Sequence, residues 1–219
     1  MNDVALVVTS CDKYSRAWPV FMHGLRKYWP ECSCKLYFVT NFKDAPAGES
    51  VKVGPDTGWS NGMLVALDRI PEPILLMMVE DYWICKSVNV FLMDVLVNLV
   101  RQGLADQIRL NVSAEAAKEE SMLDVIPDTA YYVASLQPSL WRRDYFKNFV
   151  RPDENVWQFE QNAHTRTIPG AKNFSMKEPL ISIWQKNPIT KGVWTEDAKS
   201  YIEKEGLAVP RSENPNDAI

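Results

Sequence analysis

Residues 74–84, with the sequence ILLMMVEDYWI, constrain the fold more than any other part of the chain. The apolar run from Ile74 to Val79 has no polar break, which is typical of a strand covered on both faces in the parallel sheet of an α/β domain. Two adjacent carboxylates, Glu80 and Asp81, follow the run directly. Open α/β sheets bind their ligands in the crevice beyond the carboxyl ends of the strands. The two acids therefore predict a ligand site at the end of a buried strand.

A divalent cation is the compensation that we expect for this acid pair. Ionised carboxylates beside an apolar strand are costly unless a charge or hydrogen bonds offset them. Carboxylate oxygens suit Mg²⁺ or Mn²⁺, which commonly also hold a phosphate-bearing substrate. The alternative, a solvated loop that begins at Glu80, stays open because short motifs are weak signals.

Strands and helices alternate along the chain. We expect strands at residues 4–8, 35–40, 74–79, 108–112 and 131–136, and helices at residues 15–29, 60–68, 88–102, 139–149, 155–163 and 195–205. This order predicts an α/β fold with a mixed, mostly parallel sheet flanked by helices. We expect one domain over residues 1–209 and a disordered tail over residues 210–219.

Composition excludes several classes of protein. The net charge of −4 over 219 residues gives no electrostatic footprint for nucleic acid. The four cysteines lack the spacing of a metal site, so we expect reduced thiols and a cytoplasmic protein. No signal peptide or membrane-spanning segment is expected, because the N-terminus lacks a basic region and every apolar stretch is too short.

Familiar catalytic motifs are absent from the sequence. It contains no GxGxxG, no GxxxxGK[ST] and no GxSxG pattern, which disfavours a Rossmann dinucleotide site, a P-loop and an α/β-hydrolase. Only His23 and His164 could serve a histidine-based site, and we expect His23 to be a packed or surface residue of its helix.

Two further segments carry polar residues suited to a site. The loop TSCDKY after the first strand offers hydroxyls, an acid and an aromatic ring for a base and a ribose. The segment ENVWQFE places Glu154 and Glu160 around Trp157 and Phe159, and an apolar neighbourhood raises the pKa of a carboxyl and makes it a better general base. A helix end with surface acids and core aromatics explains the same pattern equally well.

Taken in order, five segments resemble small bacterial glycosyltransferases of the GT-A fold. They are VVTSCDKYSRAW, the pair DTGWSNGMLVALDRI and ILLMMVEDYWI, SLQPSLWRRDYF, ENVWQFE and ITKGVWTEDA. They lie between residues 7 and 198, and the match as a whole covers roughly residues 4–205. The most similar group comprises poorly characterised transferases of lipopolysaccharide and capsule gene clusters. The resemblance implies a nucleoside diphosphate sugar donor, a carbohydrate or lipid-linked acceptor, Mn²⁺ or Mg²⁺, and contact with the inner membrane surface.

The resemblance also implies roles for individual residues. VEDYW is similar to the DxD-type motif, which makes Asp81 the expected metal ligand and leaves Glu80 to touch the ribose or sugar; the adjacent acids depart from the usual spacing. Glu160 is the expected general base of an inverting transfer. Lys191 and Trp194 are expected to close over the donor. The expected contacts of the nucleotide sugar are Thr9, Ser10, Asp12, Tyr14, Trp59, Ser60 and Glu80.

Two other functions remain open from the sequence. A sugar-phosphate nucleotidyltransferase uses a related scaffold, but it normally has a glycine-rich loop after the first strand, and TSCDKY has no glycine. A non-catalytic module that binds nucleotide sugars or carbohydrates would keep the fold and lack the chemistry. Nucleotide binding without transfer would distinguish this module.

Overall fold

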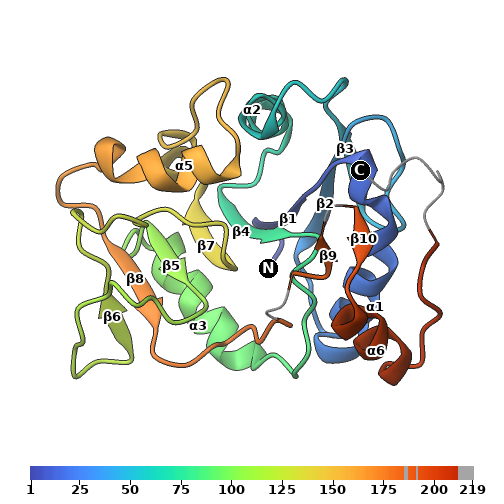
Figure 1. Ribbon diagram of the computed structural model, residues 1–219. Helices are drawn as coiled ribbons and strands as arrows, with labels where there is room; N and C mark the ends of the chain where they lie inside the picture. The colour runs from blue at the N-terminus through green and yellow to red at the C-terminus, as the bar shows by residue number, and fades with distance from the viewer. Residues whose placement is uncertain (185–186, 191, 212–219) are drawn as a thin grey trace.

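The computed structural model describes residues 1–184, 187–190 and 192–211. Within these residues, eight strands form one sheet in the order β3-β2-β1-β4-β7-β5-β8-β6 (Figure 1). The strands are β1 (Val4–Thr9), β2 (Lys35–Thr40), β3 (Glu49–Lys52), β4 (Ile74–Val79), β5 (Gln107–Arg109), β6 (Leu123–Val125), β7 (Ser139–Arg142) and β8 (Asn173–Met176). A separate hairpin pairs β9 (Ile189–Thr190) with β10 (Val193–Trp194).

Strand direction divides the sheet into two halves. β3, β2, β1 and β4 are mutually parallel, as the buried apolar runs predict. β7 runs antiparallel to both β4 and β5, and β6 runs antiparallel to β8. The sheet is therefore mixed and mostly parallel, as expected.

Helices cover both faces of this sheet. The helices are α1 (Trp18–Tyr28), α2 (Trp59–Arg69), α3 (Val90–Arg101), α4 (Arg143–Lys147), α5 (Val156–Asn162) and α6 (Glu196–Lys204), with the 3₁₀ turns η1 (Asp12–Ala17) and η2 (Ala163–Arg166). α1, α3 and α6 share one buried core with one face of the sheet, and α2, α4 and α5 share the other. In Figure 1, α2 and α5 lie above the sheet, α3 lies below it and α1 lies to its right. Alternate residues of β4 pack into opposite cores, which explains its unbroken apolar sequence.

Two expected elements are wrong. Residues 131–136 form turns and bends instead of a strand, and residues 139–149 contain strand β7 and then the short helix α4 instead of one helix. Leu140 packs into one core and Trp141 into the other, and Tyr145, Phe146 and Phe149 follow from α4 onward. A strand that serves two faces and a short helix together imitate the apolar spacing of a single helix.

Helices α1 and α2 begin without a side-chain cap. α2 begins at Trp59 after Gly58, so neither Ser60 nor Asn61, which its sequence offers as caps, serves as one. The turn η1 precedes α1, and Ser15 lies inside this turn instead of capping the helix. α6, in contrast, begins after Thr195, whose hydroxyl accepts a hydrogen bond from the Ala198 amide. The predicted tail lies almost wholly outside the described residues.

Among the helices of the described residues, none is both long and apolar enough to cross a membrane. The four cysteines are free thiols.

Candidate active site

The carboxyl ends of the parallel strands bring the predicted polar loops together. Thr9 of β1 pairs with Val79 of β4, so Ser10 and Glu80 leave the sheet side by side. Gln137 also reaches this edge, because it precedes the antiparallel strand β7. Met77 pairs with Ser139, which places the start of β7 beside the end of β4. One edge of the sheet therefore carries all these segments.

The acid pair is desolvated. Glu80 is 5% exposed, and both burial and the neighbouring charge of Asp81 raise the pKa of its carboxyl well above the ordinary value. The nearby hydroxyl of Ser10 acts against this rise in pKa. Burial likewise raises the pKa of Asp81. No Lys or Arg of the described chain forms an ion pair with either acid, so the site has negative charge without a protein cation.

This donor set fits a divalent cation that is shared with a ligand. Among the described residues, no group of three His, Cys, Asp or Glu side chains could hold a metal by itself. Mg²⁺ usually takes one or two carboxylates and completes its coordination with water and substrate phosphates. Asp81, which lines a cavity, fits that mode, whereas Glu80 is buried behind it.

Asp12 joins the loops that follow β1 and β2. Its carboxylate accepts hydrogen bonds from the backbone amides of Asn41, Phe42 and Lys43 at 2.9–3.2 Å. The Asp12 amide in turn donates to Asn41 Oδ1 at 3.0 Å. Both carboxylate oxygens of Asp12, which was predicted to contact the nucleotide, therefore hold the loop after β2 in place.

Indole groups hold the first residues after β1. Trp59 Nε1 donates to Thr9 Oγ1, and Trp18 Nε1 donates to Ser10 Oγ, each at 2.8 Å. Tyr14 is 37% exposed and lies close enough to Cys11 and the acid pair for their charges to raise its pKa, after the larger effect of burial. Burial and the charge of Glu80 raise the pKa of the Cys11 thiol to about 11. Tyr14 therefore lies near the acid pair, and Trp59 holds Thr9 at the end of β1.

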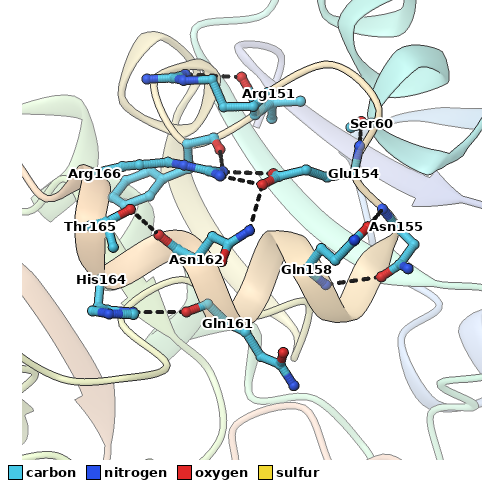
Figure 2. A network of polar contacts seen from close by, with 12 residues as sticks. Ser60, Arg151, Glu154, Asn155, Gln158, Gln161, Asn162, His164, Thr165 and Arg166 are labelled. Atoms are coloured by element: carbon cyan, nitrogen blue, oxygen red, sulfur yellow. Dashed lines mark hydrogen bonds and ion pairs between the residues drawn. The ribbon is translucent and has the colours of Figure 1, made fainter.

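Figure 2 shows the polar network that fastens α5 to α2. The Glu154 carboxylate forms a bidentate ion pair with the Arg166 guanidinium and accepts a hydrogen bond from Asn162 Nδ2 at 2.8 Å. Its backbone amide donates to Ser60 Oγ at 2.9 Å, and Ser60 N donates to its carbonyl at 3.1 Å. Asn155 caps α5 in a capping box with Gln158. Ser60, a predicted sugar contact, therefore binds the segment before α5.

Glu160 lies on α5 and faces the start of β7. Its Oε1 accepts hydrogen bonds from the Ser135 hydroxyl at 2.9 Å and from the Leu136 amide at 2.8 Å. Phe159 is fully buried, but Trp157 is 71% exposed, so Trp157 gives Glu160 no apolar cover. Glu154, the other acid of this segment, is occupied by Arg166, whose ion pair lowers its pKa.

Tyr82 connects the two predicted catalytic acids. Burial raises the pKa of its hydroxyl, and the negative charges of Asp81, Glu160 and Glu80 raise it further, in that order. Gln137 Nε2 donates to the Tyr82 hydroxyl oxygen at 3.3 Å. The charges of Asp81 and Glu160 therefore both act on the Tyr82 hydroxyl.

Sequence reasoning missed two polar residues at this edge. Asn111 follows β5, and its Nδ2 donates to Gln137 Oε1 at 3.0 Å. Arg109 is 5% exposed; its Nη1 donates to Ser113 Oγ and its Nη2 to the Tyr132 carbonyl. Burial lowers the pKa of Arg109, and the charge of Glu160 opposes that shift. The one available signal in the sequence was a charged residue, Arg109, between the apolar residues Ile108 and Leu110 of a predicted strand.

The segment predicted to close over the donor is described only in part. Lys191 lies outside the described residues. Trp194 is 7% exposed and packs beside Trp83, with ring centroids 5.9 Å apart. Its indole donates to the Pro210 carbonyl at 2.8 Å, and the Arg16 guanidinium lies over its ring. Trp194 is a packed residue in this structure.

Solved structures with the same arrangement have very different sequences. Staphylococcus aureus TarS 1–349 in complex with UDP superposes with a TM-score of 0.51 at 12% identity, over 80% of this chain and 60% of TarS. This chain has a GT-A-type fold. CMP:2-keto-3-deoxy-manno-octonic acid synthetase in complex with CTP has a TM-score of 0.51 at 11% identity, over 92% of this chain and 95% of the synthetase.

A third GT-A-like neighbour is the 4-diphosphocytidyl-2C-methyl-D-erythritol synthase of Anaerococcus prevotii. It has a TM-score of 0.50 at 12% identity, and the match covers 92% of this chain and 99% of the synthase. No protein-family model and no curated protein sequence matches the chain. The predicted GT-A fold is confirmed, and the neighbours show a fold that holds nucleotides in other proteins.

Proposed function

We propose that the protein is a glycosyltransferase that moves a sugar from a nucleoside diphosphate sugar to an acceptor hydroxyl with inversion. One observation carries this proposal: Gln137 hydrogen bonds to the hydroxyl of Tyr82, the residue after Asp81, and Leu136, the residue before Gln137, hydrogen bonds to Glu160 on α5. An inverting transfer needs a group that binds a cation to stabilise the leaving diphosphate, and a base near the incoming hydroxyl. Two separated carboxylates at one strand edge suit this division.

The donor side of the site is the part formed by the loops after β1 and β2. The UDP and CTP in two structures of the same fold support a nucleotide ligand here. Tyr14 and Trp59 offer ring surfaces to a base and ribose. Thr9, Ser10, Asp12 and Ser60 already have intramolecular partners, so we assign them to shaping the loops that a nucleotide would touch. Glu80 is buried next to Asp81, and we assign it to positioning Asp81.

Glu160 acts on the acceptor. Its free oxygen takes the hydroxyl proton while the acceptor oxygen forms a bond to the anomeric carbon and the bond to the diphosphate breaks, with the electron pair leaving on the diphosphate. Hydrogen bonds from Ser135 and Leu136 keep the carboxylate oriented. A divalent cation bound at Asp81 would supply Lewis-acid stabilisation of the departing diphosphate.

Metal-dependent nucleotide binding tests the Asp81 assignment. We expect UDP or another nucleoside diphosphate to raise the melting temperature of the wild type with Mn²⁺ and much less with EDTA, because a ligand that binds only the folded state stabilises it. The Asp81→Asn variant should lose at least tenfold in Mn²⁺-dependent affinity. Unchanged affinity in a folded Asp81→Asn protein would refute its role, and Asp56→Asn is an exposed control.

Turnover tests the Glu160 assignment. Glu160→Gln keeps an acceptor for the Ser135 and Leu136 hydrogen bonds but cannot take a proton. We expect nucleotide binding to be unchanged and transfer to fall by about 10² to 10⁴, the usual contribution of a general base. Normal turnover of Glu160→Gln would remove the base from the mechanism.

A sugar-phosphate nucleotidyltransferase is the second candidate, because this chain matches nearly the full length of two synthase structures. Release of pyrophosphate from a nucleoside triphosphate and a sugar phosphate would identify it. Release of a nucleoside diphosphate from a nucleotide sugar identifies the glycosyltransferase. Synthesis of lipopolysaccharide or capsule, at the inner membrane surface, is the setting that the sequence resemblance favours.

A further inference from the structure

A cavity of about 520 Å³ opens beside Asp81 on the side away from the nucleotide loops. Its walls include Asp81, Tyr82, Asn111, Gln137 and Trp184. These residues come from the ends of β4 and β5, the start of β7 and the segment after β8. The predicted donor residues of the β1 loop do not line it. The cavity is therefore a second compartment of the same strand edge.

One wall of the cavity is a chain of neutral polar groups. Arg109 pairs with Ser139, so Asn111 lies opposite Gln137 at the sheet edge. Asn111 donates to Gln137, and Gln137 donates to the Tyr82 hydroxyl. Asn111 is 4% exposed, and its Oδ1 has no hydrogen-bond partner in the described part of the protein. Buried polar atoms normally have partners, so this oxygen calls for a donor from outside the chain.

Another wall of the cavity is formed by Trp184, whose ring is held by aromatic neighbours. Trp184 stacks on Trp83 with ring centroids 5.2 Å apart and planes 19° apart, and Tyr201 lies 5.5 Å from it. The Trp184 amide donates to the Trp83 carbonyl at 2.8 Å, and Ile84 and Ile183 form a β-bridge next to it. The ring is therefore positioned before any ligand enters, which reduces the entropy cost of binding.

We propose that this cavity is the acceptor subsite and that it takes a neutral pyranose ring. This inference rests on the proposed transfer function. Amides and a phenol both donate and accept hydrogen bonds, as sugar hydroxyls do. An indole offers apolar surface to the C–H groups of the ring, and pockets of this kind combine such surface with a few placed polar groups. A hydroxyl bound near Gln137 lies next to Leu136, whose amide holds Glu160.

Saturation-transfer NMR with simple sugars tests the subsite without knowledge of the natural acceptor. The probes are methyl β-D-glucopyranoside, methyl β-D-galactopyranoside and methyl α-D-mannopyranoside, with glycerol as the negative control. We expect transfer to the ring protons of at least one glycoside in the wild type. The signal should fall at least fivefold in Trp184→Leu and in Gln137→Leu, while the exposed tryptophan variant Trp157→Ala keeps it.

Two results would overturn the subsite. One is the absence of transfer to any of the three glycosides in the wild type. The other is an unchanged signal in whichever of Trp184→Leu and Gln137→Leu retains the wild-type circular dichroism spectrum. Gln137→Leu keeps the size of the side chain and leaves the aromatic stack intact, so it serves if Trp184→Leu does not fold.

Competition separates the subsite from the function on which it rests. If UDP-glucose displaces the bound glycoside and UDP with Mn²⁺ does not, the cavity holds the donor sugar, and the acceptor assignment is wrong. If the glycoside stays bound in the presence of both ligands, the acceptor assignment stands. If glycosides bind through Trp184 but no nucleoside diphosphate binds the protein, the transferase proposal fails and the cavity remains a carbohydrate site.

Discussion

At the scale of single residues, a polar side chain can lie in the predicted loop and still have its hydrogen-bonding atoms occupied by other parts of the protein. Asp12 was expected from the sequence to contact the nucleotide, yet three backbone amides of another loop occupy its carboxylate. No local pattern could reveal this, because its partners lie about thirty residues away. Asn111 was missed for the complementary reason: an ordinary asparagine becomes notable only when the fold buries it with one oxygen unpaired.

Glu80 gives a prediction that depends on pH. Burial, together with the charge of Asp81, raises its pKa above the ordinary value of 4.5, so the folded protein holds this proton more tightly than the unfolded chain does. The free energy of unfolding therefore falls as the pH rises from about 4.5 through the folded-state pKa. Glu80→Gln has no proton to lose. We expect it to be more stable than the wild type at pH 8 in EDTA, with a smaller difference at pH 4.

Denaturant unfolding at the two pH values measures this effect. A stability difference between Glu80→Gln and wild type that is the same at pH 4 and pH 8 would contradict the assigned burial of the charge. Glu196→Gln is a suitable control, because Glu196 lies in the exposed first turn of α6.

At the scale of elements, the sequence predicted the half of the sheet that contains β1, β2 and β4 better than the half that contains β7. β1, β2 and β4 are parallel strands at the places where their apolar runs predict them, and α5 begins within one residue of its expected start. β7 was mistaken for helix because its two central residues pack into different cores. The turns at residues 131–136 were mistaken for a strand because their apolar side chains pack into the core shared by α2, α4 and α5. Tertiary context decides such segments.

The ion pair that fastens α5 gives the prediction for this scale. Both Glu154 and Arg166 have side chains that are little exposed, at 11% and 12% respectively. Removal of one partner leaves a charge without compensation, so we expect Arg166→Met to lower the free energy of unfolding by about 3 kcal/mol. The double variant Glu154→Gln/Arg166→Met should recover part of that loss. Urea unfolding of the single and double variants measures the coupling.

The pH dependence of this variant follows from the same pair. Arg166 lowers the pKa of Glu154, so its contribution is present above pH 4.5 and is lost as the pH falls through the folded-state pKa. The deficit of Arg166→Met should therefore shrink on acidification. A deficit that is independent of pH would mean that packing, and not charge, accounts for the loss.

At the scale of the whole molecule, Glu205 joins the end of the described chain to its first helix. Its carboxylate accepts hydrogen bonds from His23, Lys27 and Tyr28 at 2.8–2.9 Å. Burial acts to raise its pKa, but these bonds outweigh burial and the pKa is lowered. We expect Glu205→Gln to lose about 1–3 kcal/mol of stability at pH 7, less below pH 4, and the exposed control Glu203→Gln to lose little. Thermal unfolding at both pH values checks this.

β7 has a consequence for how such a protein could diversify. It enters the sheet from the edge that carries the site, so its beginning borders the cavity, and residues 110–138 form one long excursion between β5 and β7 that includes the short edge strand β6. Changes in the length of this excursion would leave the pairing of β1, β2 and β4 untouched. Under the proposed function, a lineage could therefore exchange one recipient molecule for another by remodelling a single segment, while the loops proposed to recognise the activated sugar are inherited unchanged.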